Sequence, residues 1–403
     1  MTDQLLDHLR RHAADETVPE LDLEDVIGRG RRLRRRRSVA RRSFVALVLG
    51  AVVGSIVLVG VRGEDSPDVG LTVTSRLDES DTRLVSAAYR TGGAFSRGDT
   101  LWFSDPDYSV DLGVTIQLMY YTADGVIAGV TDDDAGTARR GYVYVGTDGT
   151  VRRLHLPGKV VPGADAQADR FAYVTKRGPG YRIHVVQAST GRELTTRDFE
   201  ARYTWAGWDV PPVGLTGDYV VVGVDGAQRV INWRTGRRVA DVPGVQLPST
   251  GGGHALGSDL GWTTYRVGDS ARLRSTKDLA VYSPTDEDLP PWANNELSPD
   301  GRYVQTTNTF VSYDEKKRFV GVTDAATGRT ISDPRVYVTE VASGHRISLP
   351  GHAQTYGWTP DGRLIRVEGS TITTCDAGSG DCTNRRIEVG PGTIRMAGRY
   401  LGS

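Results

Sequence analysis

The sequence has little of what enzymes and metal proteins usually display. It contains two cysteines, three methionines and seven histidines in 403 residues. The five histidines beyond residue 70 form neither an H-E-x-x-H motif nor a paired motif, so a zinc site of the usual kind is not indicated. No G-x-S-x-G sequence occurs that would place a serine nucleophile on a strained turn. The sequence therefore predicts no catalytic residue, no metal and no cofactor.

Lysine is also scarce, with five residues against 44 arginines, and the net charge of the chain is only −1. The positive charge is concentrated in one place, because residues 29–42 hold nine arginines. The chain is therefore not a general nucleic-acid binder, which would need basic residues spread over a surface. With 38% apolar residues it is long and apolar enough to bury a large core.

The arginine block is followed by residues 43–61, nineteen residues without a charge. As a helix they would span about 28 Å, close to the ~30 Å apolar core of a bilayer. A cleaved signal peptide would have a shorter charged region and a small-residue cleavage site. The alternative of a DNA-binding tail beside a buried helix also stays open. Because flanking arginines remain cytoplasmic, we expect a retained single-pass anchor in the plasma membrane, with residues 1–42 inside and 62–403 outside.

Small residues recur at every fourth position of this predicted span, at Ala46, Gly50 and Gly54. Such spacing allows two membrane helices to pack closely. Glycine and alanine are also common in membrane helices that do not dimerise. The three residues are therefore a candidate helix-packing surface.

Beyond a linker at 62–70, residues 71–403 change to short apolar alternations interrupted by glycine, aspartate and proline. This pattern predicts antiparallel strands, and no amphipathic helix of ten residues stands out. Five segments, such as "VYVGTDGTVRRLHLPG" and "RVINWRTGRRVADVPG", each indicate a strand, a tight turn and a second strand. Their turn glycines are Gly149, Gly191, Gly236, Gly344 and Gly380, and two weaker copies place turns near Asp107 and Asp286.

These seven turns recur about every 45 residues, which is the length of a four-stranded propeller blade. The fold class is therefore all-β, a seven-bladed β-propeller, with six or eight blades as alternatives. One interval is too long, and residues 313–334 account for the surplus as an inserted hairpin or loop. The C-terminal segment 393–403 resembles the start of a blade without its second half, so we expect it to complete the first blade.

The motifs "SPDGRYV" and "TPDGRLI" and the T-G-R turns resemble those of bacterial propellers of the WD-repeat-like, TolB-like and YVTN kinds. The resemblance covers residues 70–403. It implies the fold and is nearly silent about function.

Two pairs of residues within the predicted propeller are candidate sites, one for a disulfide and one for ligand binding. Cys375 and Cys382 flank the turn "DAGSGD", where opposed hairpin positions are close enough for a disulfide, and an oxidising compartment would favour it. Trp205 and Trp208 lie between two repeats, where exposed aromatic side chains form a candidate binding patch. Propeller cores also use tryptophan, so this assignment has a structural alternative.

The N-terminal tail, with net charge −6 over residues 1–28, places Leu5, Leu6 and Leu9 on one helical face. Together with "VPELDLEDVIGRGRRLRRRR" and the span, it resembles actinobacterial membrane proteins found beside extracytoplasmic-function sigma factors. That resemblance implies a sigma factor as a cytoplasmic partner. The zinc-binding His-x-x-x-Cys-x-x-Cys motif of many anti-sigma factors is not present in the tail. A solvated acidic tail is the alternative.

The lipid bilayer is one expected partner. Together these features predict a binding module that acts as an envelope sensor or scaffold. Its ligand would be an extracytoplasmic protein or glycan, and no direct nucleic-acid binding is expected. The alternatives are a propeller-based hydrolase or lyase and a passive scaffold for envelope assembly.

Overall fold

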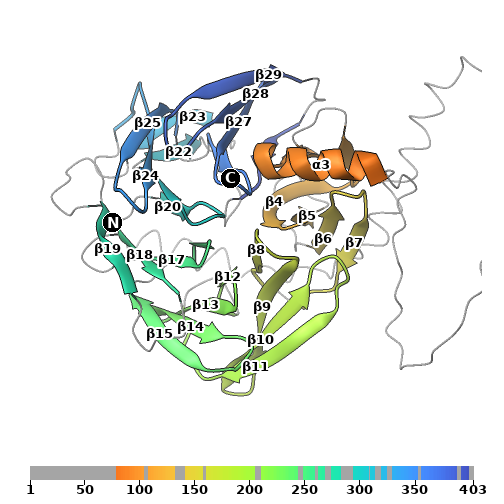
Figure 1. Cartoon of the computed structure of the whole chain (residues 1–403), viewed down its shortest axis with the longest axis vertical. Coiled ribbons are helices and arrows are strands. Elements are labelled where there is room, and N and C mark those ends of the chain that lie inside the picture. The colour runs from red at the N-terminus through yellow and green to blue at the C-terminus, as the bar shows by residue number, and fades with distance from the viewer. Residues whose placement is uncertain are drawn as a thin grey trace, which may run out of the picture.

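The described residues form a ring of β-sheets. The structure, a computed structural model, describes residues 79–398 apart from 104–107, 132–140, 158–159, 205–209, 244–247, 259–261, 268–273, 283–293, 308, 314–318, 325–328, 353–354 and 388–391. Within this part of the chain, seven four-stranded antiparallel sheets and one two-stranded sheet surround a common axis (Figure 1). The predicted all-β propeller is confirmed.

Six of the four-stranded sheets are each built from one continuous stretch of chain, with the first strand innermost and the last outermost. Their strands are β4 (Thr115–Thr122), β5 (Gly125–Thr131), β6 (Gly141–Gly146) and β7 (Val151–Leu154); β8 (Gly163–Asp165), β9 (Arg170–Arg177), β10 (Gly180–Gln187) and β11 (Glu193–Phe199); β12 (Val213–Thr216), β13 (Tyr219–Val224), β14 (Ala227–Asn232) and β15 (Arg238–Pro243); β16 (Thr250–Gly251), β17 (His254–Ser258), β18 (Trp262–Arg266) and β19 (Arg274–Tyr282); β20 (Asn294–Leu297), β21 (Tyr303–Thr307), β24 (Arg335–Glu340) and β25 (Arg346–Pro350); and β26 (Gly357–Trp358), β27 (Leu364–Glu368), β28 (Thr371–Cys375) and β29 (Cys382–Arg386).

The remaining four-stranded sheet is shared by the two ends of the described chain. It contains β1 (Phe95–Arg97), β2 (Thr100–Trp102), β3 (Ser109–Asp111) and β30 (Ile394–Met396). The order β3-β2-β1-β30 makes the C-terminal strand the innermost one, and Phe95 lies opposite Met396. The prediction that the C-terminal segment completes the first blade is confirmed.

One element, the helix α3 (Glu79–Gly92), was not predicted from the sequence. It lies over one face of the ring, at the sheet β4–β7 (Figure 1). The hydroxyl of Tyr89 donates to the carbonyl oxygens of Thr122 and Gly125, in the β4–β5 turn, at 2.6 and 2.5 Å. The Ser86 hydroxyl lies 2.8 Å from that of Thr147, in the β6–β7 turn. The expectation that residues 71–403 contain no helix of ten residues is wrong.

The predicted turn glycines have the backbone conformation that such tight turns require. Gly149, Gly191, Gly236, Gly344 and Gly380 all have φ between 70° and 82°, a left-handed conformation that side chains with a Cβ adopt at a cost. In the last turn Asp376 Oδ1 accepts hydrogen bonds from the backbone N–H groups of Gly378 and Ser379, both at 2.9 Å. These bonds lower the pKa of the Asp376 carboxyl. A side-chain-capped turn with a left-handed glycine thus closes this outer hairpin.

The turn predicted near Asp286 is misplaced. In that sheet the outermost strand is β19, Arg274–Tyr282, so Asp286 follows the outer hairpin and lies outside the described residues. The pairing of β18 with β19 changes register twice, whereas the outer pairs β10–β11 and β14–β15 each change register once.

Two other predictions of local structure are confirmed. The surplus in the sixth repeat, the one with Gly344, is an inserted hairpin of β22 (Thr309–Tyr313) and β23 (Phe319–Asp324), which pair as a separate sheet between β21 and β24 in the sequence. Cys375 and Cys382 are paired residues of β28 and β29, with Cα atoms 4.0 Å apart, and form a disulfide.

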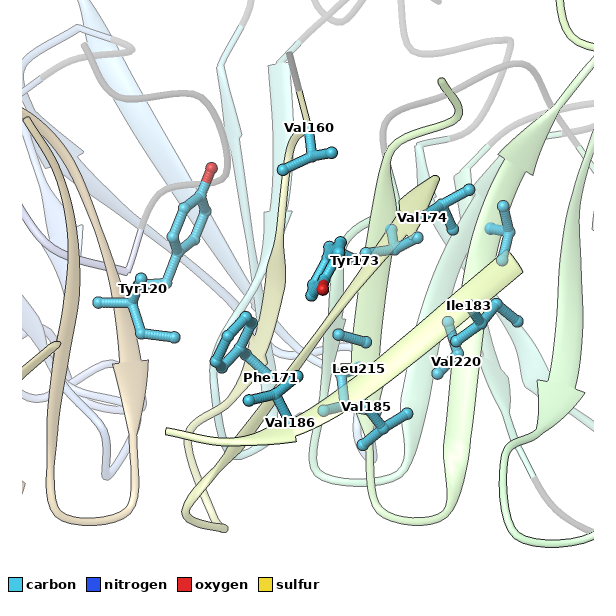
Figure 2. Packing of buried hydrophobic residues seen from close by; sticks show 14 of the residues in the cluster. Tyr120, Val160, Phe171, Tyr173, Val174, Ile183, Val185, Val186, Leu215 and Val220 are labelled. Atoms are coloured by element: carbon cyan, nitrogen blue, oxygen red, sulfur yellow. The ribbon is translucent and has the colours of Figure 1, made fainter. Parts of the chain in front are cut away.

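The core lies between the faces of neighbouring sheets. Strand β13 buries five of its six residues, so its sequence "YVVVGV" is apolar on both faces. Figure 2 shows part of one core layer, in which Phe171 and Ile183 of one sheet belong to the same buried cluster as Leu215 and Val220 of the next. Burial on both faces explains why one blade alone would not be stable and why the ring has to close.

The predicted cytoplasmic tail, membrane span and linker all lie outside the described residues. This includes the candidate helix-packing residues Ala46, Gly50 and Gly54. Among the residues that the structure does describe, no helix has the length and apolar character needed to cross a bilayer.

Candidate functional site

A small cavity lies on the axis of the ring. It is lined by the innermost strands of five consecutive sheets, among them β4, β8 and β12, and has a volume of about 70 Å³. Sites for small-molecule ligands are usually ~300–1,000 Å³. This cavity therefore has room for a few water molecules and is well below the size of a usual small-molecule site.

Glycines on the inner strands explain why this cavity is so small. A Cβ atom at Gly163 would meet the carbonyl oxygen of Val213 and lie 2.7 Å from the Cα of Gly214, and a Cβ at Gly214 would lie 2.7 Å from Cγ2 of Thr250. At Gly251 it would collide with the carbonyl oxygen of Ser298. Each glycine thus lets the next inner strand approach closely.

One buried acid, Asp165, lines the axial cavity at the end of β8. Its carboxylate accepts hydrogen bonds from the backbone N–H groups of Gln167 at 3.0 Å and Gly217 at 2.9 Å. It also lies 3.5 Å from Nη2 of Arg170. Burial raises the pKa of this carboxyl, and the two backbone hydrogen bonds and Arg170 oppose that shift. Because Gly217 belongs to the next sheet, Asp165 fastens two blades together and is not free to bind a ligand.

A larger opening is a groove at the edge of the ring, between the sheet β4–β7 and the sheet β8–β11. We call it the β7–β11 groove. It encloses about 280 Å³ and is lined by Arg152, Arg153, Leu154, His155, Leu156, Phe171, Tyr173, Val186, Thr190, Gly191 and Glu193. One wall, from β7 and the residues after it, is basic. The opposite wall, from β9 to β11, is aromatic and acidic.

A row of polar side chains continues from the acidic wall of this groove. His184 Nδ1 lies 2.7 Å from Oε2 of Glu193, and its Nε2 lies 2.9 Å from the hydroxyl of Thr175. The imidazole ring stacks on Tyr173, with centroids 4.6 Å apart and planes 4° from parallel. Both ring nitrogens are occupied and one face is covered, so the orientation of His184 is fixed.

The order of groups, hydroxyl, imidazole and carboxylate, is that of a nucleophile relay. A relay of this kind needs an accessible hydroxyl and donors for the oxyanion beside it. Thr175 is half-buried on β9, where it pairs with Arg182 of β10. Its hydroxyl lies 2.9 Å from Nε2 of His184. What these contacts show directly is a rigid polar wall that holds Glu193 in place.

A β-bulge positions this wall. Val186 lies opposite Glu193, and Val185 lies opposite Thr195, so Leu194 is the extra residue. Without the bulge Leu194 would take the position opposite Val186, and Glu193 would turn to the other face of the sheet. Leu194 is instead an exposed residue, at 36%.

The two walls of the groove differ in charge. Arg152 on β7 donates from Nε to the carbonyl oxygen of Ser189, at 2.9 Å, and so ties the basic wall to the turn of the next sheet. Across the groove, burial and the neighbouring Glu193 carboxylate raise the pKa of Tyr173 to about 12. Its phenol is therefore neutral in the physiological range. The groove offers cations on one side and a carboxylate and a phenol on the other, an arrangement suited to a polar, partly anionic ligand.

The residues predicted from sequence are only partly placed. Trp205 and Trp208, the candidate binding patch, lie in the connection from β11 to β12, outside the described residues. The disulfide is confirmed, but it belongs to the outer hairpin of a different sheet. The groove was missed, because the pairs that build it, such as His184 with Glu193, depend on strand register.

Comparison with known proteins gives matches among solved structures only. The chain matches no protein-family model and none of the curated proteins. Hsv2 of Kluyveromyces lactis is similar at 13% identity and a TM-score of 0.39, over 65% of this chain and 73% of that one. TolB of Acinetobacter baumannii is similar at 14% and 0.36, over 70% and 67%. BamB of Moraxella catarrhalis is similar at 11% and 0.33, over 72% and 92%. Likeness at this level carries no conclusion about function, and the fold rests on the strand pairing.

Proposed function

We propose that this protein is a membrane-anchored binding module, which acts outside the cytoplasm as an envelope sensor or scaffold. The observation that carries the proposal is the β7–β11 groove, a charged opening of about 280 Å³ at the edge of a ring whose axial cavity is only about 70 Å³. A rigid ring with its polar groups at the edge is suited to holding a protein or glycan ligand. The groove is far from the N-terminal tail in sequence, so ligand binding and the cytoplasmic tail would be separate activities of one chain.

The position of α3 gives the proposed orientation. The chain enters the propeller through this helix, which covers the β4–β5 and β6–β7 turns. At its C-terminal end the carbonyl oxygen of Arg90 accepts a hydrogen bond from the backbone N–H of Asp361, in the β26–β27 turn, at 3.2 Å. With a membrane span at residues 43–61, this face of the ring would be the one nearest the bilayer. The edge of the ring, with the groove, would then remain accessible from the side.

The topology can be tested by a reporter fusion. We expect alkaline phosphatase fused after Ser403 to be active, because the arginines before the predicted span stay cytoplasmic and the rest of the chain is exported. Replacing six of the nine arginines by glutamine should lower that activity, since it removes the charge asymmetry. An expressed but inactive fusion would contradict the extracytoplasmic location.

The binding function can be tested in cells by photo-crosslinking from the groove. A benzoyl-phenylalanine at His155, an exposed residue of the basic wall, should form an adduct with the ligand. The matched control is Leu84 on α3, which is 69% exposed and does not line the groove. We expect no adduct at Leu84, and a loss of the His155 adduct when Arg153→Glu cancels the positive charge of the wall, to which Arg152 and Arg153 each contribute one unit. Equal adducts at both positions, or no effect of Arg153→Glu, would rule the groove out as the binding site.

The acidic N-terminal tail motivates the proposal of a sigma factor as cytoplasmic partner. Its apolar face of Leu5, Leu6 and Leu9 and its net charge of −6 over residues 1–28 suit a segment that folds on a basic surface. We expect a peptide of residues 1–42 to bind a co-encoded sigma factor, with affinity falling as salt rises. Leu5→Asp combined with Leu9→Asp should abolish binding, because both leucines lie on one face. Titration calorimetry is the measurement, and the absence of heat at tens of micromolar peptide would leave the tail as part of the anchor.

A further inference from the structure

One outermost strand, β29, differs from the five other outermost strands whose burial the structure describes. In β29 all five residues, Cys382 to Arg386, are exposed. The outermost strands β3, β7, β11, β15 and β25 each contain buried or half-buried residues. A bare edge strand offers unpaired backbone groups to another chain, and folded proteins usually cover or interrupt such edges.

The backbone groups that this edge presents follow from its pairing with β28. The N–H of Ile387 donates to the carbonyl oxygen of Ser370, at 2.8 Å, and the carbonyl oxygen of Asp381 accepts from the N–H of Asp376, at 2.9 Å. Antiparallel strands alternate between residues that face the partner and residues that face away. Residues 383 and 385 therefore face β28 together with 381 and 387. The N–H and carbonyl groups of Cys382, Asn384 and Arg386 face outward.

The edge is held in one register. The disulfide joins Cys382, the first residue of β29, to its pairing partner Cys375. At the other end Ile387 is buried, in a cluster with Trp102 and Ile372. Both ends of the strand are thus fixed, so a binding partner would find the edge already ordered. Pre-ordering lowers the entropy cost of association.

The charge of the edge indicates what kind of chain would pair with it. Arg385 and Arg386 are consecutive, so their side chains project from opposite faces of the strand. Both are exposed, and they add two positive charges to a strand that carries no acid. In other blades, by contrast, arginines of the outer hairpins pair with acids of their own sheet, as Arg182 does with Asp198 and Arg238 with Asp241. The two cations of β29 would match carboxylates on both faces of an added strand.

We propose that β29 is a docking edge for an acidic, extended segment of a partner protein, which adds as a fifth strand to the sheet β26–β29. Backbone hydrogen bonds to Cys382, Asn384 and Arg386 would supply the pairing, and the two arginines would supply the preference for acidic sequences. The purpose of this edge rests on the proposed binding function, but the surface is distinct from the β7–β11 groove.

The test uses the full chain in nanodiscs of zwitterionic lipid and a fluorescent nine-residue peptide, Val-Glu-Glu-Val-Glu-Glu-Val-Glu-Glu, whose consecutive glutamates place carboxylates on both faces of a strand. Fluorescence anisotropy should show saturable binding that weakens with salt. A peptide with lysine in place of glutamate, and one with two central prolines, should bind at least ten-fold more weakly. Reversing both charges, with Arg385→Glu and Arg386→Glu, should weaken binding of the acidic peptide at least ten-fold.

A matched pair of variants separates strand addition from simple charge attraction. Asn384→Pro removes an outward-facing N–H and leaves the backbone bonds to β28 in place, whereas Asn384→Ala keeps that N–H. Both variants lose the hydrogen bond that Asn384 Oδ1 accepts from the Thr373 hydroxyl, at 2.7 Å, so this loss cancels in the comparison. We expect at least a ten-fold loss for Asn384→Pro and less than two-fold for Asn384→Ala, with melting temperatures confirming that both variants fold. Equal affinity of the proline and alanine variants, or no binding of the acidic peptide, would overturn the proposal.

Hydrogen exchange at single-residue resolution gives an independent measurement. In the free chain the amides of Thr383 and Arg385 should exchange slowly and those of Cys382, Asn384 and Arg386 quickly. The acidic peptide should slow the second group at least ten-fold. If those three amides are already protected, the edge is covered by another part of this chain or by a second copy, and the proposal fails. The reporter fusion tests the proposed topology separately from this edge. A cytoplasmic C-terminus combined with normal peptide binding would refute the extracytoplasmic location but not the docking edge.

Discussion

Deleting residues 393–403 is expected to lower the melting temperature of the whole propeller by about 10 °C or more. A shift of this size corresponds to a loss of several kcal/mol in the free energy of unfolding. The deletion removes β30, the innermost strand of the sheet that joins the two ends of the ring. Met396 is 5% exposed and Ala397 fully buried, and burying a side chain the size of methionine contributes about 1.5–3 kcal/mol. The deletion also frees the inner edge of β1, where each lost backbone hydrogen bond costs about 1 kcal/mol.

The effect should spread beyond this sheet because the strand is shared. The N–H of Ala397 donates to the carbonyl oxygen of Ala94, at 3.1 Å, and that of Gly398 to the carbonyl oxygen of Met119 in β4, at 3.3 Å. The segment thus connects the composite sheet to the sheet β4–β7. Without it the ring has two free ends, and a stack of blades loses stability at each end that is not covered.

Differential scanning calorimetry of the full-length chain in detergent is the measurement. A shorter truncation of residues 399–403 keeps all of β30, and we expect it to melt close to the intact chain. The two truncations together distinguish loss of the strand from loss of the terminus. Unaltered melting after deletion of 393–403 would show that the ring does not depend on this closure.

The closure is also a feature that the sequence could predict, since the C-terminal segment resembles half a blade. Repeats, turn glycines and the cysteine pair are local patterns with a fixed spacing, and they identified the fold and the disulfide. The helix α3 was missed because its buried apolar side chains include only Val85 and Tyr89, which lie four residues apart. Two apolar contacts make too weak a periodic signal in fourteen residues. The helix is held by the buried ring of Tyr89, which packs edge-on against Phe103 and Tyr121, and by hydrogen bonds to turns far along the chain.

The β7–β11 groove could not be predicted for a different physical reason. Its acidic wall depends on a single extra residue, Leu194, which decides whether Glu193 shares a face with His184. The sequence does not show where the bulge lies, because both Glu193 and Leu194 are compatible with an exposed position on the outermost strand. The bare edge of β29 could not be predicted either. Its exposure on both faces depends on how far the neighbouring sheets cover the strand, which is a property of the tertiary structure. Composition and spacing thus predict the ring, and register decides its surface.

The second large effect is expected at Gly163, on the inner strand β8. Gly163→Ala should destabilise the propeller by about 3 kcal/mol, at the upper end of the cost of overpacking a rigid core. The added Cβ would meet the carbonyl oxygen of Val213 and lie 2.7 Å from the Cα of Gly214. Both are backbone atoms of the adjacent inner strand β12, so no side chain can rotate away. The strand itself would have to move and widen the ring.

The matched control is Gly226→Ala, in the β13–β14 turn. Gly226 has φ near 79°, and a Cβ atom added there would have nothing within 4 Å, so alanine costs only the left-handed backbone conformation, about 1 kcal/mol. Chemical denaturation of the full-length variants should give a clearly larger loss for Gly163→Ala than for Gly226→Ala. The reverse order would mean that the inner strands can separate without cost. In that case the axial glycines would not be what sets the width of the ring.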